Sequence, residues 1–539
     1  MTFFRILILL LLSSLLSVRA YSQERSKVWS PDNQDNTYTN PIIHADYSDP
    51  DICKVGSDFY MTSSSFNAVP GLPILHSTDL VNWEIVNYAV KEFPGSYFDT
   101  PQHGNGVWAP CLRHHNGTFY IYWGDPDRGI FMVHTTDPSK DWSAPVLVKK
   151  AYGNIDPSPL WDDDGKVYLV HAFAHSRAGI KSTLQVVELT KEGDEILDKG
   201  VIVFDGHKDH STIEGPKFYK RNGYYYIFAP AGGVPTGWQL VLRSKNVYGP
   251  YEEKIVLAQG NTNVNGPHQG GFVEQDNGES WFVHFQDKEA YGRIVHLQPV
   301  SWVDNWPVMG NDPDGDGTGE PVLNYTKPNL LKSTIVNPIE SDEFNKGLLG
   351  LQWQWNANPQ PGWYSTDHSK GNLTLYSMPT PDKSTNLWMQ PNLLLQKFPA
   401  PSFTNTLKLD ASHLKIGETG GLVIFGLDYA TLSVTKISEG YEIQQTQCFD
   451  ADKNFPELVN ENVKSSGPVF YLKSVVQEGG KTQFMFSEDG KDYTKIGKEF
   501  TAREGKWVGA KSGIFCVREK ETGINGHLLI DWFRVERVD

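Results

Sequence analysis

A short motif occurs five times between residues 48 and 287, and it constrains the fold of this chain more than any other feature. Each copy has a polar or aromatic leading residue, in most cases a proline after it, an apolar strand, a glycine-containing turn and a second strand rich in aromatic residues. The copies contain SDPDI, VWAPC, IDPSP, IEGPK and HQGGF, and their leading residues, 48 to 59 residues apart, are Asp49, Trp108, Asp156, Glu214 and His268. A repeat of this length predicts a β-propeller of five four-stranded blades, whereas an ordinary sandwich of unrelated hairpins would give no reason for the regular recurrence.

The repeat predicts a cluster of carboxylates. The innermost strands of a propeller surround one channel. If the leading residues open those strands, Asp49, Asp156 and Glu214 meet at one mouth of the channel. Inverting hydrolysis of a glycosidic bond needs one carboxylic acid that protonates the leaving oxygen and a second carboxylate that activates water on the opposite face. A third carboxylate nearby raises the pKa of the acid. The neighbouring Asp46 and Asp51 are expected to be structural and to hydrogen-bond local backbone.

The segment from Asn40 to Val322 resembles family 43 of the glycoside hydrolases. The resemblance rests on SDPDI, WAPC, NIDPSPLWDDDGKVYL, TIEGPKFYKRNGYYYIF, GPHQGGFV and GRIVHLQPVSWVDNWPVMG, in this order. Such enzymes are five-bladed propellers that act on arabinose- and xylose-containing polysaccharides, and their chemistry requires no cofactor. The resemblance implies that Asp49 is the general base, that Glu214 is the general acid, and that Asp156 modulates the pKa of this acid and orients it.

Five further residues are predicted to bind substrate. The resemblance implies that His268 lies on the channel axis, where relatives hold water or a metal ion below the sugar, and that Arg293 reaches the pocket. The alternatives are a structural histidine and an arginine that only pairs with an acidic neighbour. Aromatic faces pack against sugar rings, so we expect Trp108, Trp238 and Phe66 to be stacking platforms.

An acidic turn, NDPDGDGTGEPV at residues 311–322, has Asp312, Asp314 and Asp316 at alternate positions, followed by Gly317. This is the beginning of a calcium-loop pattern, but the twelfth position, which an EF-hand fills with glutamate, is Leu323. A full EF-hand is therefore excluded. A structural Ca²⁺ at this turn remains an alternative to a turn without a metal, and His268 is the other candidate metal ligand.

The second half of the chain is predicted to form a separate domain. After a propeller at residues 38–325 and a linker at 326–340, residues 341–539 contain strands such as GLVIFGLDYATLSVTK and HLLIDWFRVER and no helical period, which is typical of a β-sandwich. The expected fold class is all-β. The segment SDEFNKGLLGLQWQWNANP resembles the start of the sandwich appended to one group of these hydrolases, in some of which a sandwich loop closes one side of the pocket. No residue of this domain is predicted to be catalytic.

Three features of the sequence predict where the protein is found, which partners it lacks and the state of its cysteines. Residues 1–20 combine Arg5, an apolar run and a small-residue ending, which indicates a secretory signal peptide that is too short to span a membrane. We therefore expect a periplasmic or secreted protein. The formal net charge of −16 argues against a nucleic-acid partner. The four cysteines permit three disulfide pairings, but buried free thiols are the preferred interpretation for Cys53, Cys111, Cys448 and Cys516.

These features predict an exo-acting, inverting glycoside hydrolase that releases terminal α-L-arabinofuranosyl residues from hemicellulose side chains or oligosaccharides. Because arabinofuranose and xylose present similar hydroxyl groups, β-D-xylosidase activity, alone or combined, is the alternative. Arabinofuranose is preferred only because it is common on branched hemicelluloses. A retaining fructan hydrolase would need different motifs around its carboxylates. A carbohydrate-binding propeller without activity would have no reason to keep three mutually repelling carboxylates.

Overall fold

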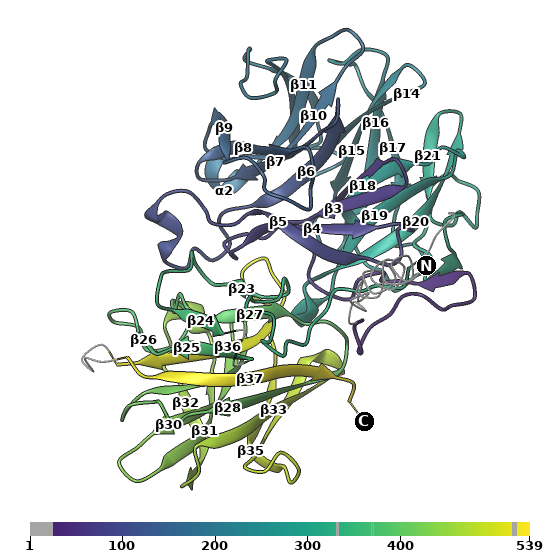
Figure 1. Cartoon of the computed structure of the whole chain (residues 1–539). Helices are drawn as coiled ribbons and strands as arrows, with labels where there is room; N and C mark the ends of the chain where they lie inside the picture. Colours follow the sequence, from purple (N-terminus) through teal and green to yellow (C-terminus); the bar gives the residue numbers. More distant parts are fainter. Residues whose placement is uncertain (1–24, 330–333, 368, 370, 520–524, 539) are drawn as a thin grey trace, which may run out of the picture.

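The computed structural model of the chain describes residues 25–329, 334–367, 369, 371–519 and 525–538. Its regular structure is almost entirely β-strand, arranged as a propeller and a sandwich (Figure 1), as the sequence predicted. The predicted signal peptide at residues 1–20 lies outside the described residues. Within the described ranges, no helix is both long enough and apolar enough to cross a membrane.

The propeller consists of five antiparallel four-stranded sheets, each formed by consecutive strands. The first two blades are β2 (Asp51–Val55), β3 (Asp58–Thr62), β4 (Gly71–Ser77) and β5 (Glu84–Val90), then β6 (Trp108–His115), β7 (Thr118–Asp125), β8 (Gly129–Thr135) and β9 (Val146–Lys150). The third and fourth are β10 (Asn154–Trp161), β11 (Val167–Phe173), β12 (Thr183–Leu189) and β13 (Val201–Asp205), then β14 (Lys217–Arg221), β15 (Tyr224–Ala231), β16 (Trp238–Ser244) and β17 (Glu252–Leu257). The fifth is β18 (His268–Glu274), β19 (Ser280–Asp287), β20 (Arg293–Val303) and β21 (Trp306–Met309).

The predicted hairpins form because their turn residues accept left-handed backbone. Asn116 and Gly117, between β6 and β7, have φ of 48° and 77°, and Asn222 and Gly223, between β14 and β15, have 51° and 72°. Two consecutive residues with positive φ match the twist of the flanking strands. The Asn-Gly pairs of the sequence therefore fix the register of the innermost strand against its neighbour in these two blades.

Apolar side chains fill the spaces between neighbouring blades. Phe59 and Met61 of the first blade pack with Val283 of the fifth, and Val170 of the third blade packs with Ile227 of the fourth. Outside the blades, β1 (Thr37–Thr39), before the first blade, pairs with β22 (Asn324–Thr326), after the fifth. Because each blade is held by its two neighbours, the inner strands are rigid supports for side chains at the channel.

The sandwich packs an eight-stranded sheet against a seven-stranded sheet. The larger sheet contains β23 (Gln354–Trp355), β26 (Met378–Pro379), β27 (Leu394–Lys397), β29 (Thr419–Phe425), β30 (Tyr429–Lys436), β31 (Tyr441–Cys448), β32 (Leu458–Ser465) and β36 (Lys511–Arg518). The smaller contains β24 (Tyr364–Asp367), β25 (Asn372–Tyr376), β28 (Phe403–Asp410), β33 (Val469–Gln477), β34 (Lys481–Ser487), β35 (Thr494–Thr501) and β37 (His527–Glu536). Their facing apolar side chains form the largest core of the molecule, which includes Leu407, Leu422, Leu472 and Ile514.

Short helical turns occupy connections between strands: η1 (Ser96–Asp99), α2 (His175–Ala178), η2 (Glu289–Tyr291), η3 (Ala451–Lys453) and η4 (Glu478–Gly480). The two domains touch directly: Val69 and Trp355 exchange two backbone hydrogen bonds, of 2.6 and 3.0 Å. All four cysteines are buried and unpaired, which confirms the preferred interpretation of the sequence.

Candidate active site

The start of each innermost strand has the same unusual backbone. Asp49, Ala109, Asp156, Gly215 and Gln269 have φ between 32° and 57°, and each directly precedes a proline or, in the fifth blade, Gly270. These five residues are the equivalent positions of the repeat. Trp108, Glu214 and His268 stand one residue earlier, so the leading residues are not all equivalent, which corrects the sequence analysis. Four of the five positions hold a non-glycine residue in a strained conformation, a feature that clusters at functional sites.

A pocket of about 130 Å³ lies at this mouth of the channel. It brings together the three predicted carboxylates, Asp49, Asp156 and Glu214. The remaining lining residues are Phe66, Trp108, Ala109, Ile155, Val234, Gln269, Arg293 and Trp507. Residues more than 160 positions apart in the chain therefore share one small concave site, as the repeat predicted.

Asp49 is fixed by three donors. Its Oδ2 accepts hydrogen bonds from the hydroxyls of Ser48, at 2.7 Å, and Ser64, at 2.5 Å. The guanidinium Nη1 of Arg293 lies 3.4 Å from Oδ1 of Asp49 and donates to Ser48 Oγ at 2.7 Å. Ser64 Oγ in turn accepts the backbone N–H of Ala109 at 2.7 Å. Asp49 therefore has a defined orientation set by two neighbouring blades and by Arg293.

Asp156 and Glu214 form the second half of the site. Asp156 Oδ2 accepts the backbone N–H of Gly215, next to Glu214, at 2.8 Å. Burial raises the pKa of Asp156 well above its ordinary value, and the negative charges of Glu214 and Asp49 raise it further. The Glu214 side chain is 33% exposed, compared with 7% for Asp49. Glu214 is thus the carboxylate most accessible to a group that enters from solvent.

His268 contacts Glu214 and does not line the pocket. Its Nε2 lies 3.2 Å from Oε1 of Glu214, and its Nδ1 is buried without a hydrogen-bond partner. The histidine is 1% exposed. The structure therefore places it behind the carboxylate, where it can orient Glu214, and not on the surface that a sugar would touch.

Two of the three predicted aromatic platforms lie in the pocket. The rings of Phe66 and Trp108 pack edge to face at 6.4 Å between centroids. Trp238 does not line the pocket: its indole N–H donates to His210 Nδ1 at 3.3 Å, and the ring packs in the core between the third and fourth blades. Trp238 was predicted only because aromatic rings stack on sugars, but it is the first residue of β16, the third strand of its blade, and does not line the pocket.

The sequence analysis missed Trp507, which reaches the pocket from the sandwich. Its ring lies 6.4 Å from that of Trp108 and is steeply inclined to it, and its backbone φ of 64° is unusual for a bulky residue. No repeat or motif includes this residue. Two nearby glycines, Gly505 and Gly509, are the only local signal in the sequence.

The acidic turn brings three possible metal ligands together away from the pocket. Carboxylate oxygens of Asp312, Asp314 and Asp316 lie within 4.8 Å of one another, and in the described part of the chain this is the only group of three such side chains. Both oxygens of Asp312 already accept backbone N–H groups of the turn, from Gly315 and Gly317. His268 belongs to no such group, and no step of the chemistry below depends on a metal.

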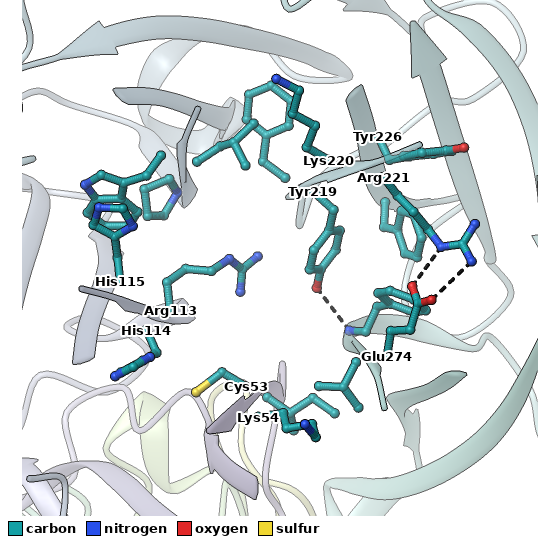
Figure 2. A pocket seen from close by; sticks show the side chains of 18 of the residues that line it. Cys53, Lys54, Arg113, His114, His115, Tyr219, Lys220, Arg221, Tyr226 and Glu274 are labelled. Atoms are coloured by element: carbon teal, nitrogen blue, oxygen red, sulfur yellow. Dashed lines mark hydrogen bonds and ion pairs between the residues drawn. The ribbon is translucent and has the colours of Figure 1, made fainter. Parts of the chain in front are cut away.

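A second, larger cavity of about 380 Å³ lies at the opposite mouth, between the far ends of the innermost strands (Figure 2). Its cations are paired: Arg113 with Asp51 at 2.9 Å, Arg221 with Glu274 at 2.7 Å and Lys54 with Asp276 at 2.8 Å. Glu274 is the only carboxylate residue among its lining residues, and Figure 2 shows it turned toward Arg221. This mouth therefore lacks the pair of carboxyl groups that glycoside hydrolysis requires.

The comparisons with known proteins agree with this geometry. The family model "Glycosyl hydrolases family 43" matches residues 38–307. The chain belongs to glycosyl hydrolase family 43. The model "Beta xylosidase C-terminal Concanavalin A-like domain" matches residues 341–536. As a member of this family the chain is a glycosidase, and such enzymes act without a cofactor.

Three relatives illustrate the similarity. A "Putative beta-xylosidase" of Xylanibacter ruminicola is 36% identical over 90% of this chain and 88% of its own length. The "Non-reducing end alpha-L-arabinofuranosidase BoGH43B" of Bacteroides ovatus is 34% identical over 63% of this chain and 65% of its own length. The crystal structure of the family 43 protein BlXynB of Bacillus licheniformis has a TM-score of 0.81 and 27% identity, and the match covers 93% of this chain and all of that one.

Proposed function

We propose that this family 43 glycosidase is an exo-acting, inverting β-D-xylosidase that removes single xylosyl residues from the non-reducing ends of xylo-oligosaccharides. The observation that carries the proposal is the small pocket in which Asp49, Asp156 and Glu214 meet. Trp507 from the sandwich forms part of its wall, so the site is bounded by both domains. A pocket with this little space suits one terminal sugar ring better than the interior of a polymer.

In the proposed mechanism Asp49 is the general base. It is held by Ser48, Ser64 and Arg293, and it takes a proton from a water molecule that attacks the anomeric carbon. Glu214, the most exposed of the three carboxyl groups, gives its proton to the departing glycosidic oxygen. Because attack and departure occur on opposite faces of the sugar, the configuration at the anomeric carbon is inverted.

Asp156 and His268 support the acid. Asp156 fixes the backbone of Gly215, adjacent to Glu214, and His268 contacts the Glu214 carboxyl group itself. The raised pKa of Asp156 keeps a proton next to Glu214 at pH values where an ordinary aspartate is ionised.

The choice of xylose over arabinofuranose reverses the order expected from the sequence. The C-terminal match is described as a β-xylosidase domain, and the Xylanibacter ruminicola relative, which matches nearly the full chain, is named a putative β-xylosidase. The α-L-arabinofuranosidase of Bacteroides ovatus supports α-L-arabinofuranosidase activity as the second candidate. The sequence-based preference for arabinofuranose rested on the abundance of that sugar and on no residue of the chain.

A side-by-side comparison of kcat/KM tests the proposal. The substrates are 4-nitrophenyl β-D-xyloside and 4-nitrophenyl α-L-arabinofuranoside, and xylobiose provides a natural linkage. We expect the xyloside to be preferred and xylobiose to yield xylose. A preference for the arabinofuranoside would replace the proposed specificity with the second candidate. Absence of turnover on all three in folded protein would contradict the proposed function.

A further inference from the structure

We propose that Asp46 is a positioning residue whose carboxylate holds the sandwich segment carrying Trp507 against the propeller strand carrying Arg293. The inference deepens the proposed function and rests on it, because its consequence is the shape of the sugar pocket. It assigns a role to a buried carboxylate that the hydrolytic steps do not use.

The carboxylate of Asp46 bridges the two domains. Its Oδ1 accepts the backbone N–H of Arg293, the first residue of β20, at 2.9 Å. Its Oδ2 accepts the backbone N–H of Gly509, which belongs to the sandwich, at 3.0 Å. Asp46 is 3% exposed, so both hydrogen bonds are shielded from water. Hydrogen bonds to an ionised acceptor are stronger than neutral ones, and each oxygen here serves a different domain.

The two backbones that Asp46 joins are in direct contact. A Cβ added at Gly292 would lie 2.6 Å from the Asp46 carboxyl carbon and 2.6 Å from the Gly509 nitrogen. A Cβ added at Gly509 would lie 2.7 Å from the Gly292 nitrogen. The adjacent Ala510 donates its N–H to the carbonyl of Ala290 at 2.7 Å. Only glycines permit this approach, so the contact between the domains here has a single close-fitting geometry.

Both ends of the bridge reach the proposed catalytic pocket. On one side, Arg293 extends its guanidinium to Ser48 and Asp49. On the other, the turn in which Gly505 donates to the carbonyl of Val508 at 2.8 Å presents Trp507 to the pocket. Trp507 is 49% exposed, and its ring lies against Gly104 and Trp108 of the propeller, so its place there depends on how its own segment is anchored. Asp46 provides that anchor two residues away.

The charge of Asp46 acts on two half-buried lysines of the sandwich, Lys397 and Lys511. Burial lowers the pKa of Lys511 to about 8, and the charge of Asp46 opposes that shift. The ammonium group of Lys397 also lies 5.1 Å from the ring centroid of Tyr47. An uncharged side chain at position 46 would leave these two cations without their acidic neighbour.

Asp46→Asn tests the inference. The amide keeps the size of the side chain, but only its oxygen can accept an N–H, and its NH₂ group would face the second donor. With 4-nitrophenyl β-D-xyloside we expect KM to rise by about tenfold or more, because Trp507 loses its fixed position. In a Trp507→Ala background the same substitution should raise KM by clearly less than in the wild-type protein, because one of the two pocket residues that Asp46 positions is absent. An unchanged KM in D46N, or effects on KM that multiply in the double variant, would overturn the proposal.

Two further variants exclude a general loss of structure. Asp342→Asn is the matched control, since this largely buried carboxylate accepts the N–H groups of Phe344, Gly350 and Trp353 within the sandwich. It should leave KM within about twofold of wild type. If D46N does not fold, Gly509→Ala provides the second test: it keeps the N–H but forces the segments apart, and it should raise KM as D46N does. An unchanged KM in G509A would count against the proposal.

Hydrogen exchange separates this inference from the proposed function. In D46N the amides of residues 505–509 should exchange faster than in wild type, whether or not the protein hydrolyses a xyloside. Wild-type protein without turnover but with this difference in exchange would overturn the proposed function and leave Asp46 as the anchor. Active wild-type protein with identical exchange and KM in D46N would overturn the role of Asp46 alone.

Discussion

The two mouths of the propeller channel show that cavity size does not identify the active site. The mouth at the C-terminal ends of the innermost strands encloses about 380 Å³. The carboxylate-bearing mouth, at the beginnings of these strands, encloses about 130 Å³. The larger cavity has paired charges and aromatic rings that neighbouring side chains cover, such as Trp302 beneath Arg221 at 4.1 Å. The smaller one has strained backbone and three carboxyl groups of differing exposure. The smaller mouth is the candidate active site because it brings together several carboxyl groups, whereas the larger one is lined by a single carboxylate residue, Glu274.

The largest difference should appear when one carboxylate at each mouth is neutralised. Glu214→Gln or Asp49→Asn should lower kcat by about 10³-fold or more, because each removes one partner of the acid–base pair. Glu274→Gln, at the opposite mouth, should leave kcat and KM within about twofold. The measurement is steady-state hydrolysis of xylobiose, whose departing sugar oxygen must be protonated, with circular dichroism as a folding check. Wild-type turnover in either E214Q or D49N would contradict the assignment of the site.

Asp51→Asn should give the reverse pattern: a large loss of stability and a small change in chemistry. Asp51 is fully buried, and its Oδ2 accepts both the Leu112 N–H at 2.8 Å and Arg113 Nη1 at 2.9 Å. Removal of one partner of a buried ion pair costs about 3–5 kcal/mol, because the other charge stays desolvated. Urea unfolding of the propeller measures the loss. Stability equal to that of wild type would show that the pair contributes nothing to this end of the channel.

A tryptophan at each mouth sharpens the comparison further. Trp108→Ala should raise KM by about tenfold, because the ring lines the sugar pocket. Trp161→Ala should leave KM unchanged at the temperature where both variants are folded, because Trp161 lies at the far mouth, stacked on His115 at 4.9 Å. Equal effects of the two substitutions on KM would mean that both ends of the channel bind the substrate.

The smallest expected effect concerns pH and Asp156. An acid with a raised folded-state pKa stabilises the protein below its unfolded pKa, and this contribution is lost as pH rises through the folded pKa. In Asp156→Asn the side chain does not titrate, so the variant does not lose this stability as pH rises. The variant should therefore gain thermal stability relative to wild type as pH rises from 4 to 8, with a change in the Tm difference of about 2 °C. A Tm difference that is constant over this range would show that Asp156 is not held protonated.

The sequence predicted the propeller because its period and its hairpin turns are local signals. Asn116–Gly117 and Asn222–Gly223 adopt the backbone that their residue types favour. The three carboxylates followed from the same repeat. The sequence could not show that Glu214 lies one residue before the position equivalent to Asp49 and Asp156. Only the backbone angles reveal that Gly215 is the equivalent residue in this blade.

The remaining parts of the site depend on contacts between distant segments. Asp46, Asp49 and Asp51 lie within six positions, yet one bridges two domains, one lines the pocket and one pairs with Arg113. Asp46 and Asp51 are structural, as expected, but they bind backbone far away in the chain and not local backbone. Trp507 belongs to the other domain, and no pattern within the sandwich indicates its direction. Such residues become visible only once the two domains are placed together.

The most direct test of the account is the anomeric configuration of the first product. Proton NMR during hydrolysis of 4-nitrophenyl β-D-xyloside resolves α- and β-xylose before they interconvert. Hydrolysis by Asp49 and Glu214 through direct attack of water predicts that α-xylose appears first. If β-xylose appears first, the reaction proceeds with retention, and Asp49 is not the base that this structure implies.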